Sequence, residues 1–478
     1  MRTRREMLAI SAAAAAAAAQ PLSREARMKA PLTKPNGLNL VVLLADTTRW
    51  DHLGAYGSKR VKTPSLDRLA AEGTLFESAY ADGLPTIPCR RVYHTGRSIL
   101  REKRNWWRPL DPEDITLSEA FLKAGGVTTG LIADTYHYFV PNMNFHRGYM
   151  SWQWIRGQES DRWMSGPRDA FDPSKHIPPH MRNQQYERAL LQYTMNTSMR
   201  KGEEDYFCAQ SCRAALEWLE RNARQKPFLL WMDTFDPHEP WDAPPRFQKM
   251  YREDYGYERY LFGYGVRHED IRESDYPIIR DLYAAEVSFV DHWIGRLLER
   301  IDQLGLRDDT IVVFTTDHGT HLGELGCVQK TPGLLNSCVA RLPLIVRHPD
   351  KKYAGKRVKG LVSAADFMPA FLAMLGIQGL PGMDGKSFWN LAESAGARNH
   401  ERVFTGMGGF CAVHDARWHY FQNLRPGDLG KGPALYDLAA DPGETQNVAG
   451  SHPNVVAELR GLLADRFQVK LPPAEGAA

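Results

Sequence analysis

The sequence contains few cysteines, only six in 478 residues, and it has no CxxC pair or Cys/His cluster at zinc-binding spacing. Cys208 and Cys212 are four residues apart in a segment with a helical pattern, a spacing that rarely suits a disulfide bond. The cysteines are therefore interpreted as buried apolar residues and not as a disulfide framework. Their number does not indicate a cellular compartment.

A long apolar run is also absent beyond the N-terminal segment, since spanning a bilayer takes about 20 apolar residues. The net charge is only +3, and nothing in it suggests the basic face of a nucleic-acid-binding domain. With 43% hydrophobic and 24% charged residues, the composition is typical of a globular protein with a sizeable core. We expect no nucleic-acid partner and no stable membrane insertion, and the oligomeric state is left open.

The first residues have the pattern of an export signal. Residues 3–8 (Thr-Arg-Arg-Glu-Met-Leu) precede an alanine-rich apolar run that ends near residues 19–20. Paired arginines and a short apolar region match a bacterial twin-arginine signal, with a Sec signal or an uncleaved anchor as alternatives. We expect residues 1–30 to be a signal peptide and linker, and the mature protein to be periplasmic or secreted from a bacterial cell.

Four short apolar runs predict strands that are buried on both faces. They are Asn39–Ala45, Phe228–Met232, Thr310–Thr315 and Leu342–Arg347. Amphipathic stretches that predict helices lie among them, at residues 63–72, 118–123, 211–222 and 283–304. This alternation favours a doubly wound α/β sheet, in which ligands bind beyond the carboxyl ends of the strands. Asp46 and the pair Asp317-His318 fall at such ends.

The pattern changes near residue 400, where short strand-like runs are separated by glycine and proline turns and followed by a helical stretch at 455–467. We therefore expect a catalytic α/β domain over residues 31–400 and a small α+β subdomain over 401–478. Residues 106–200 are rich in Trp, Tyr, Met and Pro with weak periodicity. That segment indicates either the wall of a substrate pocket or irregular packing.

One segment carries a specific motif, Leu-Pro-Thr-Ile-Pro-Cys-Arg at residues 84–90, followed by Val-Tyr-His-Thr-Gly-Arg at 92–97. It resembles the C/S-x-P-x-R signature of the sulfatase family in the alkaline phosphatase superfamily. In that register Thr86 occupies the nucleophile position and Arg90 the signature arginine. Cys89 does not fit as the nucleophile, because Tyr93 would then replace the arginine.

Two further blocks resemble the metal-binding segments of that family. Asp46 opens the first, although Thr47 replaces the second acid of the usual pair, and Asp317-His318 lies in the second block ahead of Lys330. The resemblance implies one divalent metal ion held by Asp46, Asp317 and His318. It favours Ca²⁺, while carboxylates combined with a histidine also suit Mn²⁺, Mg²⁺ or Zn²⁺. Taken alone, each block would indicate only a turn or a helix cap.

Two histidines are candidates for catalysis. His238 lies in Asp-Pro-His-Glu-Pro, which resembles the family block whose histidine binds the sulfate or assists the leaving group. His137 lies where sulfatases carry G-K-W-H, although the lysine of that block is lost. A proline-rich surface loop and a packing histidine are the respective alternatives. Residues 154–159 (Trp-Ile-Arg-Gly-Gln-Glu) form a candidate substrate-side surface, with a salt-bridged insertion as the alternative.

The resemblance covers most of the mature chain and implies an alkaline-phosphatase-like sandwich. Its large mixed, mainly parallel sheet is flanked by helices and joined by a small C-terminal subdomain. The implied function is metal-dependent hydrolysis of sulfate or phosphate esters on a glycan or another extracytoplasmic small molecule. Thr86 is expected to attack, Arg90 and Lys330 to bind the oxyanion, and His238 to assist the leaving group.

Thr86 departs from the family pattern, in which a Cys or Ser becomes a formylglycine whose hydrate provides two hydroxyls. Threonine cannot undergo this conversion and offers one hydroxyl, so that water must cleave the resulting threonine ester. A Thr-dependent phosphodiesterase, phosphonate ester hydrolase or phosphotransferase is therefore an alternative. A glycan-binding pseudo-sulfatase without catalytic activity is the alternative from another class of function.

Overall fold

The computed structural model describes residues 23–102, 105–331, 333–423 and 433–471. Residues 1–22, which hold the predicted export signal, lie outside the described residues. Within the described part of the chain, no helix is both long and apolar enough to cross a membrane. All six cysteines are free thiols and five of them are buried, as expected for apolar core residues.

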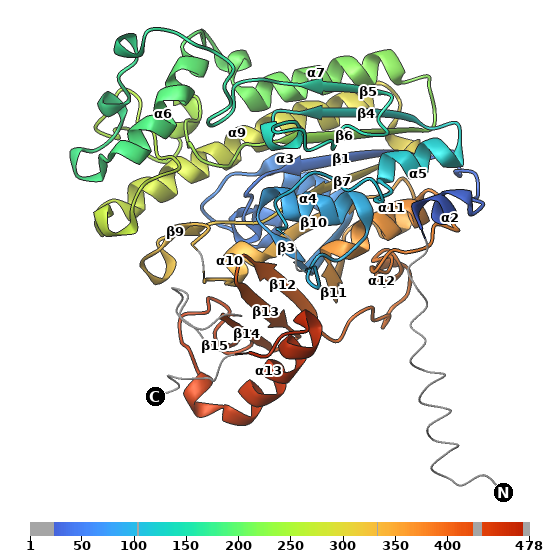
Figure 1. The fold of residues 1–478 in the computed structure, drawn as a ribbon. Coiled ribbons are helices and arrows are strands. Elements are labelled where there is room, and N and C mark those ends of the chain that lie inside the picture. Colours follow the sequence, from blue (N-terminus) through green and yellow to red (C-terminus); the bar gives the residue numbers. More distant parts are fainter. Residues whose placement is uncertain (1–22, 103–104, 332, 424–432, 472–478) are drawn as a thin grey trace, which may run out of the picture.

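An eight-stranded sheet with the order β11-β2-β10-β7-β1-β6-β4-β5 forms the centre of the molecule (Figure 1). Neighbouring strands are parallel except β10, which runs antiparallel to both β2 and β7. The expected mixed, mainly parallel sheet is thus confirmed. Its strands are β1 (Asn39–Ala45), β2 (Thr74–Tyr80), β4 (Thr128–Ala133), β5 (Ser151–Trp154), β6 (Phe228–Thr234), β7 (Thr310–Thr315), β10 (Arg341–Arg347) and β11 (Lys356–Ser363).

Helices cover both faces of this sheet, so successive side chains of a central strand enter different cores. In β1, Val42 and Leu44 pack into one core, whereas Val41 and Leu43 pack into the other. The first core includes α4 (Thr86–Thr95), α5 (Leu117–Ala124) and α11 (Phe367–Met374). The second includes α3 (Pro64–Glu72), α7 (Phe207–Asn222) and α9 (Tyr276–Gln303). Burial on both faces explains the uninterrupted apolar runs in the sequence.

The remaining helices and strands lie around these layers. The helices are α2 (Arg24–Lys29), α6 (Gln184–Thr197), α8 (Pro245–Gln248), α10 (Ser337–Ala340) and α12 (Asn390–Glu393). A short hairpin joins β8 (His321–Leu322) to β9 (Val328–Gln329).

A second sheet with the order β15-β14-β13-β12-β3 forms the smaller C-terminal unit. Its strands β12 (Val403–Met407), β13 (Phe410–His414), β14 (Trp418–Asn423) and β15 (Ala434–Asp437) are antiparallel neighbours, and α13 (Pro453–Phe467) packs on them. The edge strand β3 (Gly83–Leu84) comes from far upstream and pairs in parallel with β12. The smaller sheet therefore holds the chain immediately before Thr86.

The packing of α7 on β4 gives a test of the core. A Cβ added to Gly130 in β4 would lie 2.4 Å from an indole carbon of Trp218 in α7, so the helix or the ring must shift. We expect Gly130→Ala to lower the free energy of unfolding by about 1–3 kcal/mol. Gly202→Ala is the matched control, because a Cβ there meets no atom within 4 Å. Equal thermal unfolding midpoints for the two variants would contradict this packing.

Candidate active site

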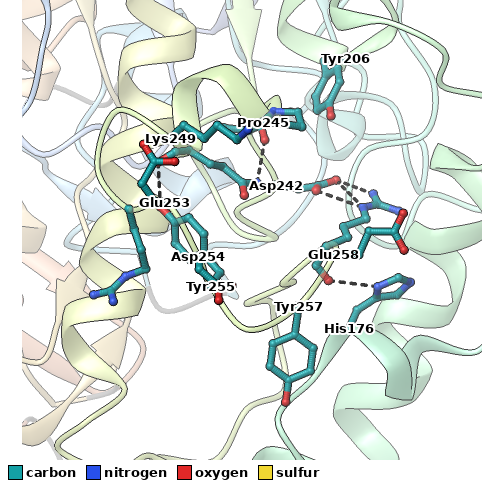
Figure 2. A pocket seen from close by; sticks show the side chains of 14 residues that line it. His176, Tyr206, Asp242, Pro245, Lys249, Glu253, Asp254, Tyr255, Tyr257 and Glu258 are labelled. Carbon is teal, nitrogen blue, oxygen red and sulfur yellow. Dashed lines mark hydrogen bonds and ion pairs between the residues drawn. The ribbon is translucent and has the colours of Figure 1, made fainter.

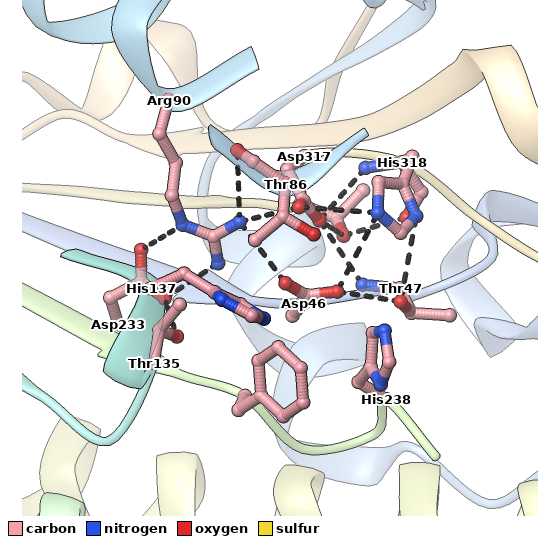
Figure 3. Close-up of polar contacts among 12 residues, drawn as sticks. Asp46, Thr47, Thr86, Arg90, Thr135, His137, Asp233, His238, Asp317 and His318 are labelled. Carbon is pink, nitrogen blue, oxygen red and sulfur yellow. Dashed lines mark hydrogen bonds and ion pairs between the residues drawn. The ribbon is translucent and has the colours of Figure 1, made fainter. Parts of the chain in front are cut away.

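The site lies at the carboxyl ends of four neighbouring parallel strands, β7, β1, β6 and β4. Asp46 directly follows β1, and the pair Asp317-His318 follows β7 after one residue. Asp233 is the penultimate residue of β6, and Thr135 follows the end of β4. Because the carboxyl ends of parallel strands meet at one edge of a sheet, these side chains converge (Figure 3).

Thr86 is the first residue of α4, the helix that packs on one face of the large sheet, and it lies at the same edge. Thr86 is buried, with 3% exposure, and its backbone carbonyl accepts a hydrogen bond at 3.3 Å from Arg90 Nη1, which also contacts Asp46 and Asp317 (Figure 3). The first turn of a helix presents backbone N–H groups and the positive end of the helix dipole, which together favour an anion. The predicted nucleophile thus lies next to the predicted metal ligands.

Arg90 lies one turn further along α4 and contacts three carboxylates. Its Nε and Nη2 donate to Asp233 at 2.9 and 2.7 Å, and its Nη1 donates to Asp317 at 2.5 Å. The same Nη1 is 3.0 Å from Asp46 Oδ2. Burial alone would lower the pKa of Arg90, but the three carboxylates raise it well above its ordinary value. Arg90 therefore holds the acidic cluster together, and its expected contact with an oxyanion stays a prediction.

Asp46, Asp317 and His318 bring ligand atoms within 4.8 Å of one another, and all three residues are buried. His318 Nδ1 donates to the carbonyl of Gly319 at 2.9 Å, so its Nε2 carries the lone pair. That Nε2 lies 3.4 Å from Asp317 Oδ2 without a hydrogen-bond partner, and Asp46 Oδ2 has Arg90 Nη1 as its ion-pair contact. Buried acceptors that face one another in this way fit a bound cation.

Thr47 occupies the place of the missing second acid and orients the other ligands. Its hydroxyl donates to Asp46 Oδ1 at 2.6 Å, and its backbone N–H donates to Asp317 Oδ1 at 3.2 Å. Its φ of 64° lies in the left-handed region, which a β-branched residue rarely adopts. Burial and the neighbouring Asp317 raise the pKa of Asp46 well above its ordinary value, and a cation would relieve that repulsion.

His238 and Lys330 form a hydrogen-bonded pair in the site, and Phe235 packs against the imidazole of His238. Lys330 Nζ donates to His238 Nε2 at 2.6 Å, while His238 Nδ1 donates to the carbonyl of Glu239 at 2.7 Å. Phe235 stacks on the imidazole at 4.1 Å between ring centroids. Burial and Lys330 hold the pKa of His238 well below its ordinary value. The imidazole is therefore neutral, and in this arrangement its Nε2 carries no proton for a leaving group.

His137 also reaches the site, where it contacts mainly aromatic rings (Figure 3). Its ring centroid lies 3.9 Å from that of Tyr136, 4.9 Å from that of Trp107 and 5.7 Å from that of Phe235. Burial, with a smaller contribution from Arg90, lowers the pKa of His137 to about 3. The structure thus brings all eight predicted site residues together, although the role of each stays a prediction.

Asp233, Thr135 and Tyr138 also contribute to the site, although the sequence alone did not indicate a role for them. Asp233 accepts hydrogen bonds from Thr135 Oγ1 and Tyr138 OH, each at 2.7 Å, in addition to its pair with Arg90. The available signals were the aspartate at the end of an apolar run and the threonine two residues before His137. Neither signal reveals that residues 135–138 contact Asp233 in the folded chain, or that Asp233 in turn binds the guanidinium of Arg90.

A separate cavity of about 450 Å³ lies beside α8 and contains none of the predicted site residues (Figure 2). Its lining includes Asp242, which pairs with Arg259, and the acidic side chains of Glu253 and Glu258. It is thus distinct from the cluster at the strand ends.

Comparison with known families agrees with this geometry. The Sulfatase family model matches residues 38–377, and the model named N-sulphoglucosamine sulphohydrolase, C-terminal, matches residues 323–468. The first match covers more than half of the chain. An alkaline-phosphatase-like sandwich with a buried Asp-Asp-His group thus defines the class, and the chain belongs to the sulfatase family, whose members depend on a metal ion.

Individual relatives are distant but extend over most of the chain. N-acetylgalactosamine-6-O-sulfatase of Bacteroides thetaiotaomicron is 24% identical over 89% of this chain and 92% of its own. The multifunctional alkaline phosphatase superfamily protein PehA of Trinickia caryophylli is 24% identical, with coverage of 91% and 96%. Iduronate 2-sulfatase is matched over a smaller share of its length, 60% for the mouse protein and 56% for the human one.

Solved structures share the fold. The phosphonate monoester hydrolase of Agrobacterium radiobacter has a TM-score of 0.70 and 23% identity, covering 90% of this chain and 96% of that one. A structure in complex with its substrate D-glucosamine-2-N,6-O-disulfate has a TM-score of 0.68 and 20% identity, with coverage of 91% and 98%. The expected fold class and family are therefore confirmed.

The metal site can be tested by direct binding. Asp317→Asn removes one negative charge from the ligand set, and we expect it to weaken Mn²⁺ or Ca²⁺ binding by at least about 10-fold. Isothermal titration calorimetry measures the affinity. Asp437→Asn is the control, because Asp437 pairs with Arg417 away from the site. Unchanged affinity in the Asp317 variant would exclude this residue as a ligand.

Proposed function

We propose that the chain hydrolyses sulfate or phosphate esters with Thr86 as the nucleophile and Asp46, Asp317 and His318 as metal ligands. The observation that carries this proposal is the position of Thr86, at the N-terminus of α4 and next to a buried ligand group in which His318 Nε2 has no hydrogen-bond partner. A cation at these ligands would favour ionisation of a nearby hydroxyl and withdraw charge from the ester. The family resemblance favours Ca²⁺, and the histidine ligand makes Mn²⁺ the main alternative.

The anionic group of the substrate is proposed to lie between the first turn of α4 and the ammonium of Lys330. The side chain of Lys330 is 12% exposed and also contacts Glu239 at 3.2 Å. Arg90 is fully buried, and its guanidinium is engaged with carboxylates. Lys330 is thus better placed than Arg90 to meet an incoming anion directly.

Thr86 favours phosphorus over sulfur as the centre of attack. A threonine ester has no second hydroxyl that could expel the product, so water must displace the group from the threonine oxygen. Such a second displacement is common chemistry for phosphoryl groups. We therefore propose phosphodiesters and phosphonate esters as substrates alongside sulfate esters, in agreement with the name of the phosphonate monoester hydrolase. A phosphotransferase would differ only in passing the group to an alcohol.

A groove next to Thr86 supports a glycan as the carrier of the ester. Its volume is about 860 Å³, within the range of about 300–1,000 Å³ typical of small-molecule sites. Leu84 and Pro85, which precede Thr86, line it together with Trp106 and Trp107. Trp107 also contacts His137, so one wall of the groove adjoins the site. Indole rings pack on sugar faces, and the relatives include sulfatases named for amino-sugar substrates.

The paired arginines and apolar run of residues 3–19 support a place outside the cytoplasm for this substrate. We propose a periplasmic or secreted enzyme of a bacterial cell.

The nucleophile is tested by replacing Thr86. We expect Thr86→Ala to lower kcat by at least about 10³-fold on the best ester among an aryl sulfate, a phosphate monoester, a phosphodiester and a phosphonate. Thr86→Ser is the matched control, because it keeps the hydroxyl and should keep much of the activity. Unchanged turnover by Thr86→Ala would remove the assigned role. Glycan binding by the wild type without turnover of any ester would favour the non-catalytic alternative.

The groove is tested separately with Trp107→Ala. We expect KM for a sulfated or phosphorylated amino sugar to rise about 10-fold, which corresponds to about 1.4 kcal/mol of lost stacking. Trp152→Ala is the control, because Trp152 is 49% exposed on β5 and does not line the groove. An equal KM for the two variants would exclude the groove as the sugar site.

A further inference from the structure

The carboxyl group of Glu159 lies beside the rings of Tyr136 and His137, which form an aromatic wall of the site. Its Oε2 accepts a hydrogen bond from Tyr136 OH at 2.7 Å and lies 3.8 Å from His137 Nε2. The side chain is only 12% exposed. Its backbone φ is 46°, in the left-handed region that residues other than glycine rarely adopt. A strained backbone at a nearly buried acid is typical of functional positions.

The turn that carries Glu159 is anchored on both sides. Asp161 accepts hydrogen bonds from Arg156 at 2.7 and 2.8 Å and from the backbone N–H of Gly157 at 2.8 Å. Gln158 donates to Asp236 at 2.6 Å, which ties the turn to the segment of His238. Asn196 donates to the carbonyls of Gly157 and Asp161 at 2.8 and 2.7 Å. The surrounding bonds thus fix the position of the carboxyl group.

The elements packed around Glu159 supply several polar and charged groups. Tyr136 donates its hydrogen bond, His137 lies at ion-pair distance, and Ser160 is the next residue in the turn. Glu239 and Lys330 act on Glu159 through space from the side of His238. Glu159 therefore lies directly beside Tyr136 and His137, on the part of the site that these two residues form.

We propose that Glu159 is the proton donor to the departing oxygen of the ester and the proton acceptor for the water that follows. This inference rests on the proposed function. His238 cannot take this role in the observed arrangement, because its Nε2 accepts from Lys330 and its Nδ1 is bound to a backbone carbonyl.

The proposed reaction consists of two displacements. Thr86 Oγ, having released its proton to solvent, forms a bond to phosphorus or sulfur while the ester bond to the leaving oxygen breaks. The leaving oxygen keeps the electron pair and takes the proton of Glu159. Water then attacks the threonine ester, Glu159 takes a proton from that water, and the threonine oxygen leaves and regains a proton from solvent. The net reaction consumes one water and restores both residues.

The electrostatics agree with this role. Burial raises the pKa of Glu159 to about 7, and Glu239 contributes in the same direction, while Tyr136 and Lys330 oppose it. A carboxyl group with this pKa exists in both protonation states near neutral pH, as a group that both donates and accepts a proton requires. Because the protonated form donates, turnover limited by the first step should fall as the pH rises through about 7.

The test compares leaving groups. In Glu159→Gln we expect the single-turnover rate of leaving-group release from an ethyl ester, whose alkoxide needs a proton, to fall about 10²-fold. The same rate for the matching 4-nitrophenyl ester should change little, because that leaving group departs without a proton, and the decline above neutral pH should disappear. Glu253→Gln is the control, because Glu253 lines the separate cavity of Figure 2. Equal losses for both esters, or no loss for either, would overturn the proposal.

Tyr136→Phe provides a second readout that a purely structural role would not produce. The Tyr136 hydrogen bond lowers the pKa of Glu159, so its removal should move the decline in ethyl ester turnover to higher pH. An unmoved profile would count against Glu159 as the titrating group. A wild-type protein that hydrolyses no ester would overturn the proposed function and this proposal together, whereas an active wild type with the same leaving-group dependence as Glu159→Gln overturns this proposal alone.

Discussion

The buried ion cluster around Arg90 is the interaction on which the site depends. The ends of the three strands β1, β6 and β7 place Asp46, Asp233 and Asp317 in one region from which solvent is excluded. Removing one partner of a buried ion pair costs about 3–5 kcal/mol, so the guanidinium that contacts all three carboxylates fixes their arrangement. Arg90 lies on α4, so this cluster also fixes the position of the helix and of Thr86 at its start.

The two sheets meet at the same place. The smaller sheet takes β3 as its edge strand, and β3 ends two residues before Thr86. The nucleophile position is therefore held from one side by the C-terminal unit and from the other by the ion cluster. This double attachment gives the C-terminal unit a part in the geometry of the site, although its own strands contribute none of the predicted metal ligands.

Much of the architecture could be predicted from the sequence because its central strands are buried on both faces. The bounds of β1 and β7 agree with the predicted runs, since no polar residue interrupts them. In contrast, β2 contains Glu77 and β11 contains charged residues near the sheet edge, so neither shows such a run. The two-residue strand β3 is too short to give any periodic pattern.

The proposed metal ligands were recognisable from the sequence for a similar reason, because each lies at or just beyond a predictable strand end. The contributions of Asp233 and Glu159 were not, because they depend on contacts between distant segments. The motif around His238 suggested a proton donor, but a motif does not specify a tautomer. That tautomer is set by the carbonyl of Glu239 and by Lys330, both of which become neighbours of the imidazole only in the fold.

The neutral state of His238 follows from the distribution of charge across the site. The positive charge of Arg90 is neutralised by buried carboxylates of the protein. The side chain of Lys330, in contrast, is partly exposed beside His238. A protonated His238 would place a second cation 2.6 Å from that ammonium in a buried setting, which desolvation and like-charge repulsion both oppose. In the proposed function Lys330 supplies the positive charge for the substrate anion, and this assignment leaves the proton for the leaving group to another residue, which we propose to be Glu159.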